Sequence, residues 1–275
     1  MADLQARIEE LWERRAELSP QDGDAAQVVE EAIELLDTGQ ARVAEVDPAS
    51  DEVVVHEWLK RSILLLFSLR GMETIEHGPF EYADKLPLKR GFAEAGVRVL
   101  PGASARWGSH LARGVVLMPS YVNIGAWVGA GSMVDTWATV GSCGQIGERV
   151  HLAGGVGIGG VLEPPNAVPV VIEDDAFVGS RCMVTGGARV GRGAVLGAGA
   201  FLDPSIPVID AETGQEISRG VVPPWSVAIR ASRRREFPGG EFFVPCVLVI
   251  KRLSEGERHD KAQLNQVLRD HGAGV

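Results

Sequence analysis

The chain has 275 residues with a formal net charge of −10, enough length for one or two domains with a sizeable core. The acidic balance argues against nucleic-acid binding, which needs a basic face. The longest apolar stretch of the N-terminal region, Ser62 to Leu69, is too short to span a bilayer, so no membrane partner is expected. Three cysteines, Cys143, Cys182 and Cys246, match no zinc motif and cannot all pair, so we expect no metal and a cytoplasmic protein.

The first hundred residues are predicted to be mostly helical. Apolar residues at helical spacing predict one helix around residues 4–12 and a second around 28–36 that ends near Gly39. Residues 53–55 form a Val-Val-Val run typical of a short strand, and a third helix is expected from about residue 57 to 70. We assign residues 1–104 to a mostly helical N-terminal domain.

From Val116 onward, an aliphatic residue returns at every sixth position. The first run continues through Val122, Val128, Val134, Val140, Ile146, Leu152 and Ile158, and a second covers Ile172, Val178, Val184, Val190, Leu196 and Leu202. Six residues do not fit a helical turn, whereas three hexads make one triangular coil of a parallel β-helix. Glycine often follows the aliphatic residue directly, where it would permit positive-φ corners. The fold class is therefore mainly β, a left-handed parallel β-helix over residues 105–208.

An interruption separates the two runs, because Ile158 and Ile172 are fourteen residues apart, two more than two hexads. Pro164 and Pro165 predict an external loop near 163–171, and loops on rigid scaffolds often carry binding groups. After the repeat, we expect a hairpin turn at 210–216, a buried strand at 242–250 and a short helix at 257–271. These would form a small C-terminal α/β cap, residues 209–275, over the exposed end of the β-helix.

Three stretches of the repeat, residues 118–127, 131–143 and 150–164, resemble one family, the tetrahydrodipicolinate N-succinyltransferases of the diaminopimelate–lysine pathway. The most specific is Met-Val-Asp-Thr-Trp-Ala-Thr-Val-Gly-Ser at 133–142, and the resemblance extends to segments 13–17 and 58–60. It implies transfer of a succinyl group from the cosubstrate succinyl-CoA to the amine of the ring-opened substrate. It also implies direct transfer in a ternary complex, and a homotrimer with active sites between neighbouring β-helices.

Such a reaction needs a base for the amine, partners for carboxylates and close alignment of both reactants. The resemblance assigns a catalytic and substrate-binding role to Asp135, although its slot after an inward aliphatic residue, shared by Glu173 and Asp203, also suits a corner-turn carboxylate. The resemblance assigns substrate contact to Arg98, whose alternative is a solvated surface charge.

Other candidates depend on position in the repeat. Glu163 at the mouth of the loop and Arg181 on the following coil are candidate substrate-binding residues, or else a turn carboxylate and a surface charge. For His151, directly before an inward aliphatic residue, a structural role is favoured over a catalytic one. Glycines at two corners suit close approach by the pantetheine arm of succinyl-CoA: Gly154, Gly155, Gly159 and Gly160.

One departure from the family leaves alternatives open, because Met183 stands where the resemblance expects a glutamate. An acyltransferase that uses acetyl-CoA or serves secondary metabolism, acting on a related amino-dicarboxylate, is the first alternative. A carbonic anhydrase would need three zinc-binding histidines, but only His110 and His151 fall in the repeat. A non-catalytic structural β-helix is the third alternative.

Overall fold

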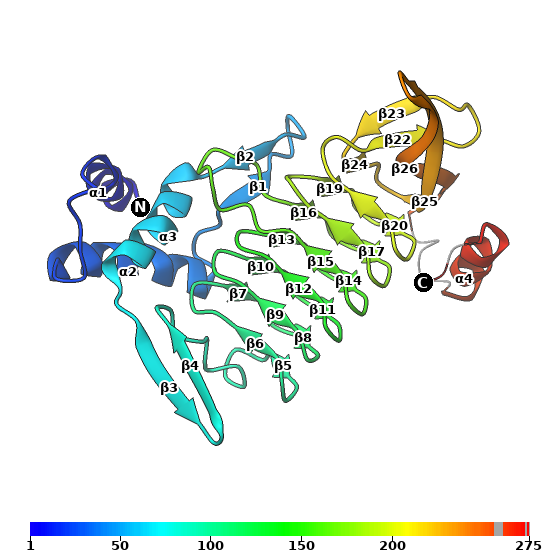
Figure 1. Cartoon of the computed structure of the whole chain (residues 1–275). Coiled ribbons are helices and arrows are strands. Elements are labelled where there is room, and N and C mark those ends of the chain that lie inside the picture. The colour runs from blue at the N-terminus through cyan, green and yellow to red at the C-terminus, as the bar shows by residue number, and fades with distance from the viewer. Residues whose placement is uncertain (256–260, 273, 275) are drawn as a thin grey trace.

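The computed structural model describes residues 1–255, 261–272 and 274, and a stack of triangular β-coils dominates it (Figure 1). The first three helices of the chain lie at the N-terminal side of the stack, and a long hairpin and the last helix lie at its C-terminal end (Figure 1). Within the described residues, no helix is both long and apolar enough to cross a membrane.

The three predicted N-terminal helices are confirmed as α1 (Ala2–Glu13), α2 (Gly23–Thr38) and α3 (Glu57–Leu69). Helix α2 ends at Gly39, which adopts φ 78° and so closes the helix in the left-handed conformation that glycine tolerates. The predicted strand at 53–55 is β2 (Val53–Val55), paired antiparallel with β1 (Ala44–Val46). A hairpin of β3 (Glu73–His77) and β4 (Phe80–Asp84) was not anticipated.

Three sheets form the sides of the triangular stack, and their strands recur in order along the chain. Sheet 1 contains β5 (Arg98–Val99), β8 (Val116–Leu117), β11 (Met133–Val134), β14 (His151–Leu152), β17 (Phe177–Val178), β20 (Val195–Leu196), β25 (Ser226–Phe237), β26 (Gly240–Arg252), β22 (Pro207–Asp210) and β23 (Glu216–Arg219). Sheet 2 contains β6 (Ser104–Ala105), β9 (Tyr121–Val122), β12 (Thr139–Val140), β15 (Gly157–Ile158), β18 (Met183–Val184) and β21 (Phe201–Leu202). Sheet 3 contains β7 (His110–Leu111), β10 (Trp127–Val128), β13 (Gln145–Ile146), β16 (Val171–Ile172), β19 (Arg189–Val190) and β24 (Val221–Val222). The parallel β-helix is therefore confirmed.

Each short coil strand places its first residue outward and its second inward, where it stacks on the equivalent residue of the next coil. The aliphatic residues predicted to face inward do so from Val122 onward, but the first prediction, Val116, was wrong. Leu117, which is 0% exposed, is the inward residue of β8, and Val116 faces outward. The coil corner between Leu117 and Val122 is one residue shorter than a hexad, so a count from Val116 reaches Val122 by coincidence.

The glycines that follow inward aliphatic residues have a different purpose from the predicted one. Gly129, Gly141 and Gly147 do not have positive φ; a Cβ on any of them would come within 2.7 Å of the backbone of the next coil. They permit close approach between coils. The left-handed position lies three residues after the inward residue, and both Gly125 (φ 74°) and Trp137 (φ 61°) occupy it.

The interruption is larger than the sequence suggested. Strand β13 pairs with β16, so Gln145 lies opposite Val171, 26 residues on, whereas Trp127 lies opposite Gln145, 18 residues on. The loop therefore adds eight residues to one coil. The side chain of Lys60, from α3, holds this loop against the N-terminal helices. Lys60 is 0% exposed, and its Nζ donates to the carbonyl oxygens of Pro164 (3.2 Å) and Ala167 (2.7 Å).

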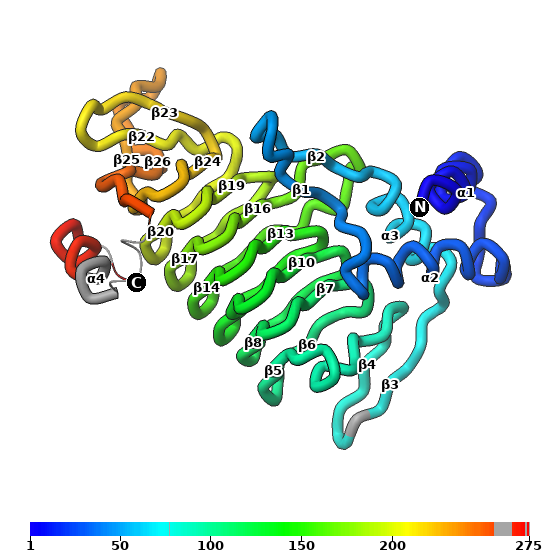
Figure 2. The backbone as a smooth tube through the Cα atoms, turned by 180° about the vertical axis from the view of Figure 1, so that it is seen from behind, coloured from blue at the N-terminus to red at the C-terminus, as the bar shows by residue number. Residues whose placement is uncertain are grey.

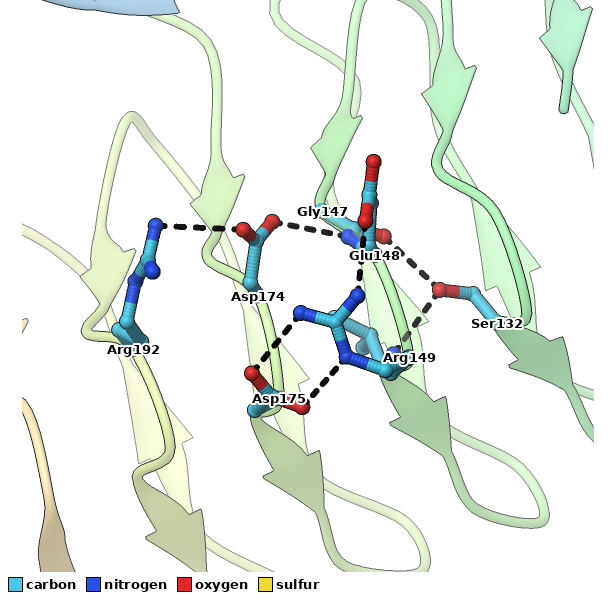
Figure 3. A network of polar contacts seen from close by, with 8 residues as sticks. Ser132, Gly147, Glu148, Arg149, Asp174, Asp175 and Arg192 are labelled. Atoms are coloured by element: carbon cyan, nitrogen blue, oxygen red, sulfur yellow. Dashed lines mark hydrogen bonds and ion pairs between the residues drawn. The ribbon is translucent and has the colours of Figure 1, made fainter. Parts of the chain in front are cut away.

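A polar network ties together the coils on either side of this insertion (Figure 3). Arg149 pairs with Asp175 (Nε to Oδ1, 2.9 Å), and the backbone N–H of Glu148 donates to Asp174 Oδ1 (2.9 Å). Arg192, from the following coil, pairs with Asp174 at 3.2 Å. These contacts lie at the corner between sheets 3 and 1, so they hold the register that the longer coil would otherwise loosen.

At the C-terminal end, β24 and β25 extend sheets 3 and 1 after an excursion that contains β22 and β23. The predicted strand at 242–250 lies within β26, but it is not buried throughout, because Phe243 is 73% exposed near the hairpin tip. The predicted terminal helix is α4 (Lys261–Asp270), and the predicted start at 257–260 lies outside the described residues. The domain boundaries at 104/105 and 208/209 stay predictions.

Candidate active site

The corner between sheets 1 and 2 carries a carboxylate–imidazole pair. Asp135 directly follows β11, and His151 begins β14, the next strand of sheet 1. Register pairs Met133 with His151, so the outward imidazole lies beside the corner that Asp135 begins. His151 Nε2 is 3.2 Å from Asp135 Oδ2, with the side chains 34% and 28% exposed. The pair is thus accessible to a small molecule yet fixed in place.

The electrostatics of Asp135 favour its ionised form. Burial acts to raise its pKa, but hydrogen bonds from the backbone N–H of Thr136 (2.6 Å) and from His151 outweigh it, so the pKa lies below its ordinary value. An ionised carboxylate can only accept hydrogen bonds, so Nε2 of His151 is the donor in this contact. The His151 ring also makes a T-shaped contact with the ring of Phe177, with 5.3 Å between centroids, and this contact further fixes its orientation.

Trp137 projects from the same corner, and sequence reasoning had not singled it out. Its side chain is 75% exposed, and its backbone adopts φ 61°, a conformation that costs a non-glycine residue about 1–3 kcal/mol. A large exposed indole held in a strained conformation beside Asp135 is a candidate wall of the site. The available signal was its place three residues after the inward Val134, where most coils have glycine.

Four of the sequence-derived candidates lie along this corner. The N–H of Gly155 donates to the carbonyl of Thr136 (2.8 Å), and the N–H of Arg181 donates to the carbonyl of Gly154 (3.0 Å). Asp135, the Gly154–Gly155 turn and Arg181 therefore occupy successive coils, about 4.8 Å apart. Because Arg181 is exposed, its guanidinium is available to an anion that lies along the corner.

Arg98 lies on the same sheet but further along it. It is the exposed first residue of β5, in the outward row that continues through Val116 and Met133 to His151. Two strand spacings separate β5 from β11, about 10 Å. The structure thus places Arg98 and Asp135 on one face at a distance that a dicarboxylate with its contacts can bridge.

The remaining candidates lie elsewhere. Glu163, Gly159 and Gly160 follow β15, at the corner between sheets 2 and 3, which is the other edge of sheet 2. Within one chain, the structure does not bring them to Asp135. Glu163 is exposed at the start of the inserted loop, and its peptide bond to Pro164 is cis.

Met183 occupies the outward row of sheet 2, where it is 44% exposed. Its side chain lies over Gly157 of the preceding coil, because a Cβ on that glycine would come within 2.7 Å of Met183 Cε. The surface next to the corner is therefore apolar at the position where the resemblance expects a carboxylate. Among the residues described, no group of three or more histidine, cysteine or acidic side chains could hold a metal ion.

Comparison with known proteins gives matches to two family models. One, described as tetrahydrodipicolinate N-succinyltransferase N-terminal, matches residues 3–69, and one described as hexapeptide repeat of succinyl-transferase matches residues 169–204. A solved hexapeptide transferase family protein from Anaplasma phagocytophilum is 16% identical, with a TM-score of 0.36 over 64% of this chain and 92% of its own.

Two relatives resemble the whole chain. The 2,3,4,5-tetrahydropyridine-2,6-dicarboxylate N-succinyltransferase of Acinetobacter baylyi is 46% identical over 277 residues. The protein of the same name from Methylorubrum extorquens is 45% identical over 282 residues. Each alignment covers 98% of this chain and 99% of the relative, so the likeness includes the helical region, the β-helix and the C-terminal segment.

Proposed function

The chain belongs to the tetrahydrodipicolinate N-succinyltransferase family, and from that membership we propose that it moves a succinyl group from succinyl-CoA to the amine of ring-opened tetrahydrodipicolinate. This is a CoA-dependent acyl transfer in the diaminopimelate–lysine pathway. We propose direct transfer in a ternary complex, in the cytoplasm. The observation that carries the mechanism is the Asp135–His151 pair at an open corner.

In this mechanism His151 is the base. Its Nδ1 takes a proton from the substrate ammonium, and Asp135 stabilises the imidazolium through the 3.2 Å contact at Nε2. The amine attacks the thioester carbon, and a tetrahedral intermediate forms. The nitrogen of the intermediate carries one proton more than the product amide, and this proton leaves to water as collapse breaks the carbon–sulfur bond. The departing thiolate of CoA takes the other proton, the one held by the imidazolium. Asp135 therefore acts through His151 as a positioning residue.

Positioning of the reactants falls to the other candidates. We propose that Arg98 and Arg181 pair with carboxylates of the two reactants, because both are exposed arginines on the two sides of Asp135. The Gly154–Gly155 turn, one coil from Asp135, leaves room for the pantetheine arm to approach the backbone.

We propose a homotrimer, which would also give Glu163, Gly159 and Gly160 a role. Sheet 3 is covered by the N-terminal elements, whereas the outward row of sheet 2 exposes Met183 (44%) and Phe201 (43%). A threefold arrangement would place one edge of sheet 2 near the sheet 1–sheet 2 corner of a neighbouring copy. The second group of candidates would then contribute to a site shared between copies.

The experiment that tests this function is release of free thiol from succinyl-CoA and from acetyl-CoA, each with tetrahydrodipicolinate as acceptor. We expect turnover with succinyl-CoA and at most a trace with acetyl-CoA. Initial rates at varied concentrations of both substrates should give intersecting double-reciprocal lines, whereas parallel lines would indicate an acyl-enzyme and contradict direct transfer. A monomeric mass in solution would contradict the shared site.

A further inference from the structure

A cavity of about 550 Å³ lies between the N-terminal elements and sheet 3, away from the sheet 1–sheet 2 corner. Figure 2 shows its surroundings, with α2 and β1 beside β7, β10 and β13. Its lining includes Gln5 of α1, Arg42 and Glu45 next to and within β1, His56 and Trp58 at the start of α3, and Trp127 of β10. The volume falls within the range of about 300–1,000 Å³ that is typical of small-molecule sites.

Arg42 is held rigidly at the edge of this cavity. Its Nε donates to the buried side chain of Gln145 (2.7 Å), and its guanidinium lies over the ring of Trp127, 4.7 Å from the centroid. Trp127 in turn packs on His110, with 4.1 Å between ring centroids. Burial lowers the pKa of Arg42, against the opposing fields of Glu45 and Asp174. The guanidinium is thus oriented by neutral partners and partly stripped of water.

The absence of a close counter-ion distinguishes Arg42 from comparable residues. Each of five other half-buried arginines has a carboxylate within ion-pair distance: Arg61, Arg70, Arg106, Arg189 and Arg233. In the described part of the chain, Arg42 is the only half-buried arginine without such a partner. Arg42 is therefore a partly desolvated cation next to an open cavity, neutralised only by carboxylates at longer range. A ligand carboxylate in the cavity would supply the close counter-ion that it lacks.

The cavity also offers a negative group. Glu45 Oε1 contacts His56 Nε2 at 3.1 Å, which leaves the second carboxylate oxygen for another donor. One guanidinium and one carboxylate suit a ligand with both charges. A phosphate would instead bring about two negative charges to a single cation and a nearby carboxylate. We propose that this cavity is a second ligand site, which binds an amino acid of the length of lysine, with its carboxylate on Arg42 and an ammonium group on Glu45.

Calorimetric titration of the full-length protein with L-lysine tests the proposal. Cadaverine, which is lysine without its carboxylate, is the matched probe. We expect saturable binding of lysine and at least about tenfold weaker binding of cadaverine, because a hydrogen-bonded charge pair contributes about one to two orders of magnitude in affinity. Arg42→Gln should weaken lysine binding by at least about tenfold. Arg61→Gln, at a half-buried arginine of α3 outside the cavity, should leave it unchanged.

Two further variants make every outcome decisive. Glu45→Gln alters a side chain that is 58% exposed, so it tests the ammonium contact even if Arg42→Gln does not fold. Asp135→Asn separates the cavity from the corner site, and it should leave lysine binding intact. Absence of lysine binding, equal binding of cadaverine, insensitivity to both cavity variants or loss of binding in Asp135→Asn would each overturn the proposal. Because no CoA is present, failure of the proposed acyl transfer would not affect this result.

Discussion

The relation between Asp135 and His151 can be tested by a double-mutant cycle. If His151 is the base, His151→Gln should lower kcat/KM by about 10²–10⁴-fold, which corresponds to about 2.7–5.4 kcal/mol of transition-state stabilisation. Asp135 makes one charge-assisted contact to the imidazole, at 3.2 Å in a partly exposed setting. Such a contact contributes about 1.5–3 kcal/mol, so Asp135→Asn should cost about 10–150-fold.

The double variant decides between two roles for Asp135. If the carboxylate acts through His151, then adding Asp135→Asn to His151→Gln should cause little further loss in kcat/KM. If Asp135 instead holds the substrate ammonium directly, the two losses should multiply. Thiol release from succinyl-CoA measures all four proteins. The matched control is Asp203→Asn, because Asp203 occupies the equivalent slot after Leu202, but its side chain bonds, within the described residues, to Ser205 alone. Wild-type turnover by His151→Gln would refute the mechanism.

Three other predictions concern the same corner and its scaffold. The pKa of Asp135 is lowered in the folded protein, so its carboxylate stabilises the fold at pH values above the ordinary carboxyl pKa. In urea titrations, the difference in free energy of unfolding between wild type and Asp135→Asn should be constant at neutral pH. It should shrink below about pH 4. Gly141→Ala should lower the free energy of unfolding by about 3 kcal/mol or more, because the new Cβ would come within 2.6 Å of Gly160 Cα. The control is Gly154→Ala, whose Cβ would lie 3.5 Å from the nearest atom. This control should change the free energy of unfolding by less than about 1 kcal/mol. Trp137→Gly should leave the free energy of unfolding within about 1 kcal/mol of the wild-type value, because relief of left-handed strain offsets the conformational entropy of glycine. The variant should nevertheless raise KM for a substrate. An unchanged KM would show that Trp137 is not part of the site.

The sequence was sufficient for the architecture of the β-helix but not for its detailed frame. A six-residue period reflects stacking of inward side chains, and that stacking is the dominant source of burial, so the period predicts the fold. It does not distinguish Val116 from Leu117, because both are aliphatic and only the shortened corner decides which faces inward. The role of Gly141 does not follow from the sequence either, since close approach of the next coil and a positive φ both require glycine.

The candidate site was partly predictable for a similar reason. Asp135 was identified through resemblance, and the spacing of 18 residues per coil already places Met133 opposite His151. That arithmetic makes His151 an outward residue on the next coil, but it does not show that the Asp135 side chain turns toward it. Glu163 is a candidate because it lies at the mouth of the inserted loop, whereas three-sided coiling puts it at a different corner from Asp135. Sequence proximity along a β-helix carries no information about which corner a residue occupies unless the hexads are counted.

Strain in the backbone gives an independent reason to place the site at the sheet 1–sheet 2 corner. Several coils put a non-glycine residue in the left-handed position, at a cost of about 1–3 kcal/mol each. Arg149 and Asp175 recover that cost by pairing with each other (Figure 3).

Trp137 and Arg181 show no comparable recovery. They take the same left-handed position, and both are exposed. Among the described residues, the side chain of neither makes a hydrogen bond or ion pair that would offset the strain. They flank Gly155 on consecutive coils, next to Asp135. Folding alone favours glycine at both positions, so the retention of an indole and a guanidinium there is best explained by contacts with ligands that arrive from outside the chain.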